Sequence, residues 1–215
     1  MLRALIFDVD GTLAETEELH RAAFNAAFAA AALDWHWDVP LYGQLLRVTG
    51  GKERLRHFAS LRGEALEDAL VMQLHEAKNQ RYAELVRHCP LRPGVERLIR
   101  NARTNNLQLA IATTTSRAKV HALLAATIGG GFFEAIVAGD EVARKKPAPD
   151  VYQRAMALLG TGPAQCLAFE DSRNGLAAAR AAGLATIVTP GVYTVGEDFA
   201  GAAQVLADLS GFSLP

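Results

Sequence analysis

Five short apolar runs stand out along the chain, and polar residues do not alternate with apolar ones inside them. Uninterrupted runs of this length are typical of strands that are buried on both faces of a parallel sheet. They predict strands over residues 4–9, 108–113, 135–138, 166–169 and 185–189. Helical patterns lie between them, over residues 93–105, 116–127, 148–159 and 173–182. Strands that alternate with helices indicate an α/β fold with a doubly wound parallel sheet.

The segment from residue 14 to residue 88 differs, because it contains no convincing strand. Apolar residues recur there at three- and four-residue spacing, which predicts helices over residues 17–33, 39–46, 52–61 and 64–86. Proline and glycine punctuate these helices. We therefore expect two domains: an α/β core formed by residues 1–13 and 89–215, and an all-helical cap formed by residues 14–88. The two crossings between them are expected to act as hinges.

Composition excludes some partners. The 215 residues suit one α/β domain with a smaller insert, and the hydrophobic fraction of 50% is enough for a substantial core. The formal net charge of -1 provides no broad basic field, so we expect no nucleic-acid partner. The apolar run at the N-terminus is too short for a signal peptide or a membrane span, so we expect no membrane association. The default expectation is a cytoplasmic monomer, or one in an organelle stroma if a transit peptide has been removed.

Polar side chains with catalytic chemistry follow the apolar runs. In an open parallel sheet, ligands bind beyond the carboxyl ends of the strands, so these residues are expected to meet there. They are Asp8 and Asp10 after the first run, Thr113, Thr114, Thr115 and Ser116 after the second, Lys146 ahead of the helix over residues 148–159, and Glu170 and Asp171 after the fourth.

These side chains match what the hydrolysis of a phosphate ester needs. A carboxylate can attack phosphorus, which divides one difficult step into two, and we assign that role to Asp8. The leaving alkoxide needs a proton, for which Asp10 is the predicted general acid and, toward water, the general base. Thr113 and Lys146 are predicted to bind the phosphoryl group.

A carboxylate and a phosphate repel each other, which predicts a bridging hard cation. Mg2+ takes oxygen ligands from one or two carboxylates and from the phosphate itself. Asp8 and Asp171 are the predicted carboxylate ligands, and Asp10 is predicted to contribute its main-chain carbonyl. Glu170 is predicted to act either as a direct ligand or through water. Gly11 permits the tight turn that brings the first two aspartates to one point.

Each part of this set has an ordinary explanation when it is taken alone. Residues 10–12 can form a simple turn, and residues 113–116 or 170–172 can cap the helices that follow them. Lys146 can be a solvated lysine, and Asp150 is expected to begin a helix. The parts occur together and in order, and this joint pattern favours the catalytic interpretation.

The sequence DVDGTL at residues 8–13 resembles the first motif of the haloacid dehalogenase superfamily. Thr113, Lys146 with Pro147, and the pair Glu170-Asp171 fall where the second, third and fourth motifs of that superfamily belong. The resemblance extends along the whole chain. It implies a Mg2+-dependent phosphatase that works through an aspartyl-phosphate intermediate, on a core domain with an inserted cap.

The helical insert after the first motif resembles the cap of the subfamily that contains phosphoglycolate phosphatases and β-phosphoglucomutase. Caps close over small substrates and exclude water, so a small phosphorylated metabolite is implied. Residues 14–21, 49–54, 78–79, 110–116 and 190–199 resemble the CbbY-type sugar-bisphosphate phosphatases. Members of that branch associated with carbon fixation dephosphorylate xylulose-1,5-bisphosphate, and the resemblance implies this substrate class.

A bisphosphate needs a second phosphate site away from the nucleophile, and basic side chains with backbone amides after a glycine turn can provide it. The candidate substrate-binding residues, including those for the sugar, are Glu17, His20, Tyr42, Gly50, Gly51, Lys52, Arg54, Lys78, Arg81, Thr114, Thr115 and Ser116. The basic residues of the cap are explained as well by surface charge. Glu17 also suits a helix N-terminus, and His20 and Tyr42 can simply pack inside the cap.

Three other functions share this fold. A sugar phosphomutase of the β-phosphoglucomutase kind has matching residues at Thr16, His20 and Lys78, and motifs do not reveal the lifetime of its aspartyl-phosphate. A dehalogenase does not need Asp10 or the metal carboxylates, which argues against that activity. A non-enzymatic regulatory protein is expected to have lost Asp8, Asp10 or Lys146, and all three are present.

Overall fold

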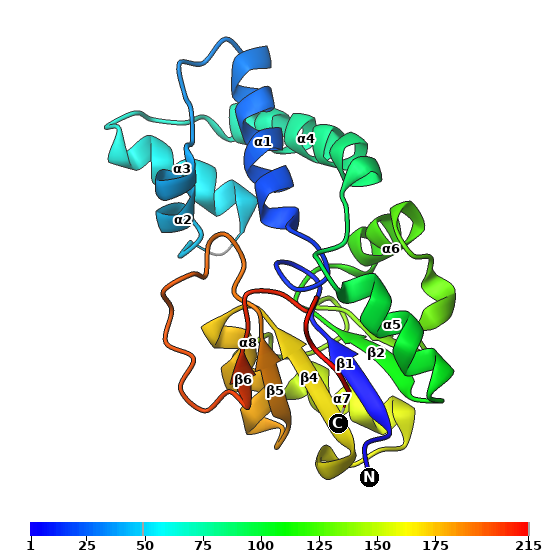
Figure 1. The fold of residues 1–215 in the computed structure, drawn as a ribbon. Helices are drawn as coiled ribbons and strands as arrows, with labels where there is room; N and C mark the ends of the chain where they lie inside the picture. Colours follow the sequence, from blue (N-terminus) through cyan, green and yellow to red (C-terminus); the bar gives the residue numbers. More distant parts are fainter. Residues whose placement is uncertain (49, 215) are drawn as a thin grey trace. The chain divides into compact units, whose positions relative to one another are not determined.

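The computed structural model describes residues 1–48 and 50–214. Within these residues, six strands form one parallel sheet in the order β3-β2-β1-β4-β5-β6 (Figure 1). The strands are β1 (Ala4–Phe7), β2 (Gln108–Ala112), β3 (Ala135–Val137), β4 (Cys166–Glu170), β5 (Ala185–Val188) and β6 (Gln204–Val205). The predicted α/β fold with a doubly wound parallel sheet is therefore confirmed. Only β6 was not predicted, because two exposed residues give no apolar run.

Helices cover both faces of the sheet. They are α5 (Val95–Thr104), α6 (Arg117–Ala126), α7 (Asp150–Leu159) and α8 (Arg173–Ala181), as Figure 1 shows. Ala4 and Ile6 of β1 share one core cluster with residues of α7 and α8. Because strand side chains alternate between faces, Phe7 points to the other side, where it stacks on Phe169 at 4.6 Å between ring centroids. Burial on both faces explains why these strands are continuous apolar runs.

The strand register brings the predicted catalytic residues to one edge of the sheet. Phe7 of β1 pairs with Ile111 of β2 and with Phe169 of β4. The residues that follow each strand therefore emerge side by side. The sheet also reverses its order between β1 and β4, and such a reversal is where open α/β sheets bind ligands.

The chain divides into two compact units, one formed by Met1–Thr16 with Cys89–Pro215 and the other by Glu17–His88. The second unit, Glu17–His88, is called the helical unit below. It carries α1 (Thr16–Ala30, of which Thr16 belongs to the first unit), α2 (Val39–Leu45), α3 (Gly51–Leu61), α4 (Asp68–Leu85) and the short 3-10 helix η1 (Val86–His88). Its described residues contain no strand. Aromatic side chains fill its interior, with Trp37 lying 4.7 Å from Phe24 and 5.5 Å from Phe58 between ring centroids.

One predicted helix is longer than the observed one. The pattern predicted a helix over residues 64–86, whereas α4 begins at Asp68. The side chain of Glu64 accepts hydrogen bonds from Trp35 Nε1 at 3.0 Å and from Arg62 Nε at 2.5 Å. These contacts hold residue 64 in the connection ahead of α4, and sequence spacing gives no sign of them.

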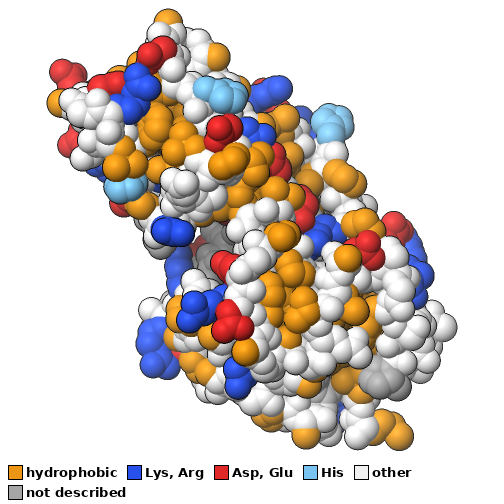
Figure 2. All heavy atoms as spheres, turned by 60° about the vertical axis from the view of Figure 1, so that its left-hand side comes forward, with side chains coloured by type: hydrophobic (Ala, Val, Ile, Leu, Met, Phe, Trp, Pro, Cys, Tyr) orange, Lys and Arg blue, Asp and Glu red, His pale blue; other side chains and the backbone are white. Residues whose placement is uncertain are grey.

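None of the described helices is both long enough and apolar enough to cross a membrane. On the face shown in Figure 2, Lys and Arg side chains are interspersed with acidic and hydrophobic ones. This agrees with the near-neutral formal charge of -1.

Candidate active site

A tight turn after β1 carries the two aspartates of the first motif. Gly11 has a φ of +75°, and a Cβ at this position would overlap the carboxylate of Asp171. The turn is closed by Gly11 N, which donates to Ala14 O at 2.8 Å. Only glycine combines this backbone conformation with so close an approach. Gly11 therefore allows the turn to lie against Asp171.

Lys146 reaches Asp8 from the loop ahead of α7. Its Nζ lies 2.6 Å from Asp8 Oδ1 and 2.6 Å from Glu170 Oε1, and the Lys146 side chain is only 6% exposed. The lysine therefore joins the residue after β1 to the last residue of β4. A solvated lysine, which was the ordinary explanation of Lys146, does not have these contacts.

Glu170 is held in place from three directions. Besides Lys146, Tyr152 OH donates to Glu170 Oε1 at 2.5 Å, and Asp171 N donates to Oε2 at 3.3 Å. Gly175 of α8 packs so closely that a Cβ there would overlap the Glu170 carboxylate. Ser172 caps α8 by accepting from Gly175 N at 3.2 Å.

Burial and like charge perturb the titration of this group. Burial, with the nearby charges of Glu170 and Asp10, raises the pKa of Asp8 to about 7, although Lys146 opposes the shift. Burial and the charges of Asp8 and Glu170 raise the pKa of Asp171 well above its usual value. Burial by itself lowers the pKa of Lys146, but the two carboxylates beside it raise it above its usual value, so the ammonium stays charged. Several carboxylates thus share one buried positive charge.

The carboxylates of Asp8, Glu170 and Asp171 fit a divalent metal ion. One oxygen from each lies within 4.8 Å of the others, and all three residues are buried. Oxygen donors of this kind suit hard divalent cations, whose charge also offsets the repulsion that raises the pKa of these acids. The carboxylate of Asp10 is not in this group. Its predicted contribution was the main-chain carbonyl, and that assignment stays a prediction.

Two threonine hydroxyls hold the carboxylate of Asp10. Thr16 Oγ1 donates to Asp10 Oδ1, and Thr115 Oγ1 donates to Oδ2 at 2.5 Å. Thr113 is fully buried, and its Oγ1 accepts from Thr115 N at 3.1 Å, so its own hydroxyl proton is available to donate elsewhere. Ser116 is the N-cap residue of α6, and Thr114 is half-buried beside it.

Glu17, Tyr42 and Arg54 form a connected chain inside the helical unit. Tyr42 is fully buried; its OH donates to Glu17 Oε2 at 2.9 Å and accepts from Arg54 NH1 at 3.1 Å. Arg54 Nε also donates to the carbonyl of Leu45 at 3.1 Å. Burial, followed by the charge of Glu17, raises the pKa of Tyr42 well above its usual value, so its hydroxyl remains a donor.

The other predicted residues of the helical unit differ in exposure. Lys78 is 4% exposed, with Nζ 5.1 Å from the ring centroid of Phe24 and 5.5 Å from that of Tyr82. His20 stacks on Tyr82 at 4.0 Å between ring centroids. Arg81, another candidate substrate-binding residue, is exposed and pairs with Glu84 at 2.6 Å.

The glycine turn lies at the start of α3. Gly50, with a φ of +97°, is the N-cap residue of this helix, and Gly51 is its first residue. Lys52 is half-buried in the first turn. Thr49, which belongs to the same resembling phrase, lies outside the described residues.

Comparisons with known proteins agree with this arrangement. The family model for haloacid dehalogenase-like hydrolases matches residues 2–183. The chain belongs to the haloacid dehalogenase-like hydrolase family. It is 58% identical over 214 residues to Protein CbbY of Rhodobacter capsulatus, a match that covers 97% of this chain and 94% of that protein. The predicted resemblance to the superfamily and to its CbbY-type branch is thereby confirmed.

Solved structures of related hydrolases have the same fold. The crystal structure of CbbY from Rhodobacter sphaeroides in complex with phosphate is 47% identical, with a TM-score of 0.86, over 98% of this chain and 96% of that one. A mutant of that protein, in complex with xylulose-1,5-bisphosphate, is 46% identical with the same TM-score of 0.86 and the same coverage of 98% and 96%.

Some residues that contact the site of this hydrolase had no predicted role. Tyr152 contacts both Lys146 and Glu170, with Lys146 Nζ lying 5.1 Å from the centroid of its ring. A signal was present, because a tyrosine on an otherwise apolar helix face needs a buried partner for its hydroxyl. Thr16 was noted for its match to a mutase and within the phrase over residues 14–21, and nothing in its spacing predicts the bond to Asp10.

Proposed function

We propose that this protein is a Mg2+-dependent phosphatase for phosphorylated sugars, a phosphoric monoester hydrolase whose nucleophile is Asp8. The observation that carries this proposal is the contact of Lys146 with Asp8 at 2.6 Å, beside the buried carboxylates of Glu170 and Asp171. The proposed nucleophile, an ammonium suited to phosphoryl oxygens and an acid cluster that could hold a metal ion thus lie together at one edge of the sheet.

The reaction has two balanced steps. In the first, one oxygen of Asp8 forms a bond to phosphorus while the bond from phosphorus to the sugar oxygen breaks. Asp10 gives its proton to the departing sugar oxygen. In the second, water attacks the aspartyl-phosphate, Asp10 accepts a proton from that water, and inorganic phosphate leaves. Asp8 and protonated Asp10 are restored.

The remaining residues bind and orient the phosphoryl group. Lys146 places a positive charge beside Asp8, where the phosphoryl oxygens accumulate charge in the transition state. Thr113 provides a hydroxyl donor at the neighbouring strand end. Asp8, Asp171 and either an oxygen of Glu170 or a bridging water are the proposed ligands of Mg2+, with the carbonyl of Asp10. The ion, when bound, offsets the repulsion between the nucleophile and the phosphate.

We propose xylulose-1,5-bisphosphate as the substrate. The support is the crystal structure of a CbbY mutant from Rhodobacter sphaeroides in complex with this compound, to which the chain is 46% identical over 98% of its length. The helical unit is the proposed cap. Its glycine turn with Lys52 is the proposed site of the second phosphate, and Glu17, held by Tyr42, is proposed to accept hydrogen bonds from sugar hydroxyls.

The test is the release of inorganic phosphate from xylulose-1,5-bisphosphate, with Mg2+ and with a chelator in its place. Ribulose-1,5-bisphosphate, which differs only in the configuration at one carbon, is the matched comparison. We expect one phosphate per substrate, dependence on Mg2+, and loss of turnover in Asp8→Asn. Unchanged turnover in Asp8→Asn contradicts the mechanism, and equal rates on both bisphosphates contradict the substrate.

The phosphomutase remains the alternative. Two structures described as β-phosphoglucomutases that resemble this chain are 24% and 20% identical, so they support the fold alone. A mutase is expected to convert one hexose phosphate into its isomer with no net release of phosphate. Stoichiometric release from the bisphosphate excludes it.

A further inference from the structure

Arg92 lies in the segment that returns the chain to the α/β unit, just ahead of α5. Its side chain is only 10% exposed. NH1 donates to the carbonyl oxygen of Gly11 and, at 2.7 Å, to that of Thr189. NH2 donates to the carbonyl oxygen of Pro190 at 2.9 Å, and Nε pairs with Glu15 Oε1 at 3.1 Å. One guanidinium therefore joins the first-motif turn to the segment after β5.

These contacts lie just after Asp10 in the sequence. Gly11 follows Asp10 directly, and Glu15 directly precedes Thr16, whose hydroxyl donates to Asp10 Oδ1. The backbone of Arg92 also holds the turn, because its N–H donates to the carbonyl of Leu13 at 2.8 Å. Arg92 thus contacts the turn at three places: at Gly11, which adjoins the proposed general acid, at Leu13 and at Glu15.

The segment after β5 also reaches the acidic cluster. Thr189 and Pro190 lead into Gly191, where a Cβ would lie 3.2 Å from Asp171 Oδ2. Thr194 Oγ1 donates to the same oxygen at 3.4 Å. The arginine therefore links the turn that carries Asp8 and Asp10 to a segment that packs against Asp171.

We propose that Arg92 is a positioning residue for catalysis, which sets the place of the Asp10 carboxylate by holding the turn over residues 9–16 against the segment after β5. This inference rests on the proposed phosphatase function. Arg92 touches neither Asp8 nor Asp10 through its side chain, and it acts through the backbone of Gly11 and the side chain of Glu15.

An arginine is required at this place because its donors point in several directions. The planar guanidinium offers five N–H groups in a fixed fork. A lysine carries the same charge, but its three donors radiate from a single nitrogen. Lys cannot reach Gly11, Pro190 and Glu15 together from one position. Arg92→Lys therefore keeps the charge and removes the simultaneous contacts.

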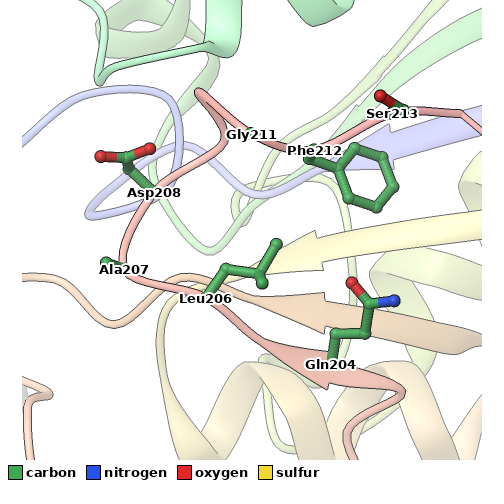
Figure 3. A pocket seen from close by; sticks show the side chains of 7 residues that line it. All are labelled: Gln204, Leu206, Ala207, Asp208, Gly211, Phe212 and Ser213. Carbon is green, nitrogen blue, oxygen red and sulfur yellow. The ribbon is translucent and has the colours of Figure 1, made fainter.

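Arg97 provides a matched control. It also donates to backbone carbonyls of the C-terminal segment, from NH2 to Leu209 at 2.8 Å, Ser210 at 3.0 Å and Phe212 at 2.7 Å. That segment borders a pocket of about 410 Å³, and Figure 3 shows Phe212 and Asp208 on its walls. No lining residue of this pocket belongs to the acidic cluster, and the hydrogen bonds of the Arg97 side chain go to this C-terminal segment.

The experiment compares Arg92→Lys with Arg97→Lys in the full chain, well below the melting temperature of either variant. We expect Arg92→Lys to lower kcat on xylulose-1,5-bisphosphate by about ten- to a hundredfold, with little change in KM, because small displacements of reacting groups have effects of this size. Arg97→Lys should lower the melting temperature and leave kcat unchanged. A kcat for Arg92→Lys equal to that of the wild type overturns the proposal.

Amide hydrogen exchange tests the same inference without turnover. The turn amides are hydrogen-bonded, with Gly11 N 2.8 Å from Ala14 O and Leu13 N 2.9 Å from Val9 O. Arg92→Lys should speed exchange across residues 9–16, whereas Arg97→Lys should speed it only in the C-terminal segment. If the wild type hydrolyses no phosphate ester, the proposed function fails, and the exchange result still decides whether Arg92 holds the turn.

Glu15→Gln keeps the test decisive if Arg92→Lys does not fold. It weakens one contact of the guanidinium and leaves the carbonyl contacts in place. We expect a smaller fall in kcat, with faster exchange confined to residues 9–16. Wild-type kcat together with wild-type exchange in this variant overturns the proposal.

Discussion

Lys146 and Asp8 form a nearly buried ion pair, in which the nitrogen and oxygen are 2.6 Å apart and the two side chains are 6% and 9% exposed. Removing both charges from water is costly, and such a pair is weak evidence for stability. Under the proposed function its value lies in catalysis, because the charge is already in place when a phosphoryl group arrives. Glu170 shares the same ammonium at 2.6 Å and fixes its position.

Replacing Lys146 by Met should abolish most of the activity while leaving the chain folded. The thioether chain fills similar space but provides no charge to the phosphoryl oxygens, so we expect kcat to fall by about a hundred- to a thousandfold. Lys145→Met is the control, because Lys145 is exposed and adjacent in sequence. Steady-state rates of phosphate release check both. A loss in Lys145→Met as large as that in Lys146→Met contradicts the assignment.

Asp8→Asn should stabilise the metal-free protein at alkaline pH. The pKa of Asp8 is raised from 3.8 to about 7 by burial and by the nearby acids. The folded state therefore binds the proton more tightly than the unfolded state. The contribution of protonated Asp8 to the free energy of unfolding is complete below the unfolded pKa and is lost as pH rises through about 7. With a chelator present, the gain in melting temperature for Asp8→Asn over the wild type should be larger at pH 8 than at pH 5.

Asp150→Asn is the control of opposite sign. The hydrogen bond and charge of Arg144 lower the pKa of Asp150, so its contribution is present above the unfolded pKa and is lost as pH falls. This variant should be only slightly less stable than the wild type at pH 8, because the Arg144 side chain of the pair is 70% exposed. If the melting temperature of Asp8→Asn shows no gain over the wild type at pH 8, or the same gain at pH 5 and pH 8, the raised pKa of Asp8 does not limit stability.

The core of the site could be predicted from the sequence because local patterns determine it. The predicted carboxylates and threonines follow apolar runs, Lys146 precedes a predicted helix, and parallel strands deliver such residues to one edge. Tyr152 and Arg92 could not be predicted in this way, because their partners lie far away in the sequence. Glu170 to Tyr152 and Gly11 to Arg92 are contacts that only the folded chain creates.

The helical unit was predictable in type but not in detail. Three- and four-residue spacing indicated its helices, yet the start of α4 depends on the contact between Glu64 and Trp35. Lys78 and Arg81 lie three residues apart, a spacing that puts both on one side of a helix. The structure buries the first among aromatic rings and exposes the second, because packing against α1 decides which part of that face is covered.

Tyr152→Phe should lower activity with little effect on folding. The substitution keeps the ring beside Lys146 and removes only the hydroxyl that donates to Glu170 Oε1. With one donor fewer, Glu170 should draw Lys146 toward itself and away from the phosphoryl site. A small displacement of a group that must meet the phosphoryl oxygens is enough for a fall in kcat of about tenfold or more.

Met156→Leu controls for a general disturbance of α7 in this comparison. Met156 lies in the same buried cluster one turn further along the helix, and this volume-conserving change should leave kcat unchanged. Measurement of kcat, KM and melting temperature separates positioning from packing. A fall in melting temperature without a fall in kcat means that Tyr152 serves only the core.

Gly175→Ala should destabilise the protein, although the same substitution usually stabilises a helix. Alanine normally stabilises a helix interior relative to glycine by about 1 kcal/mol. At Gly175, however, the added methyl would overlap the Glu170 carboxylate, which cannot retreat because Lys146 and Tyr152 hold it. We therefore expect a lower melting temperature and a lower kcat.

Gly162→Ala is the control, since its φ is -102° and a Cβ there meets no atom within 4 Å. A more stable and fully active Gly175→Ala would show that Glu170 is free to move, which would remove the basis for assigning it a fixed role beside Lys146.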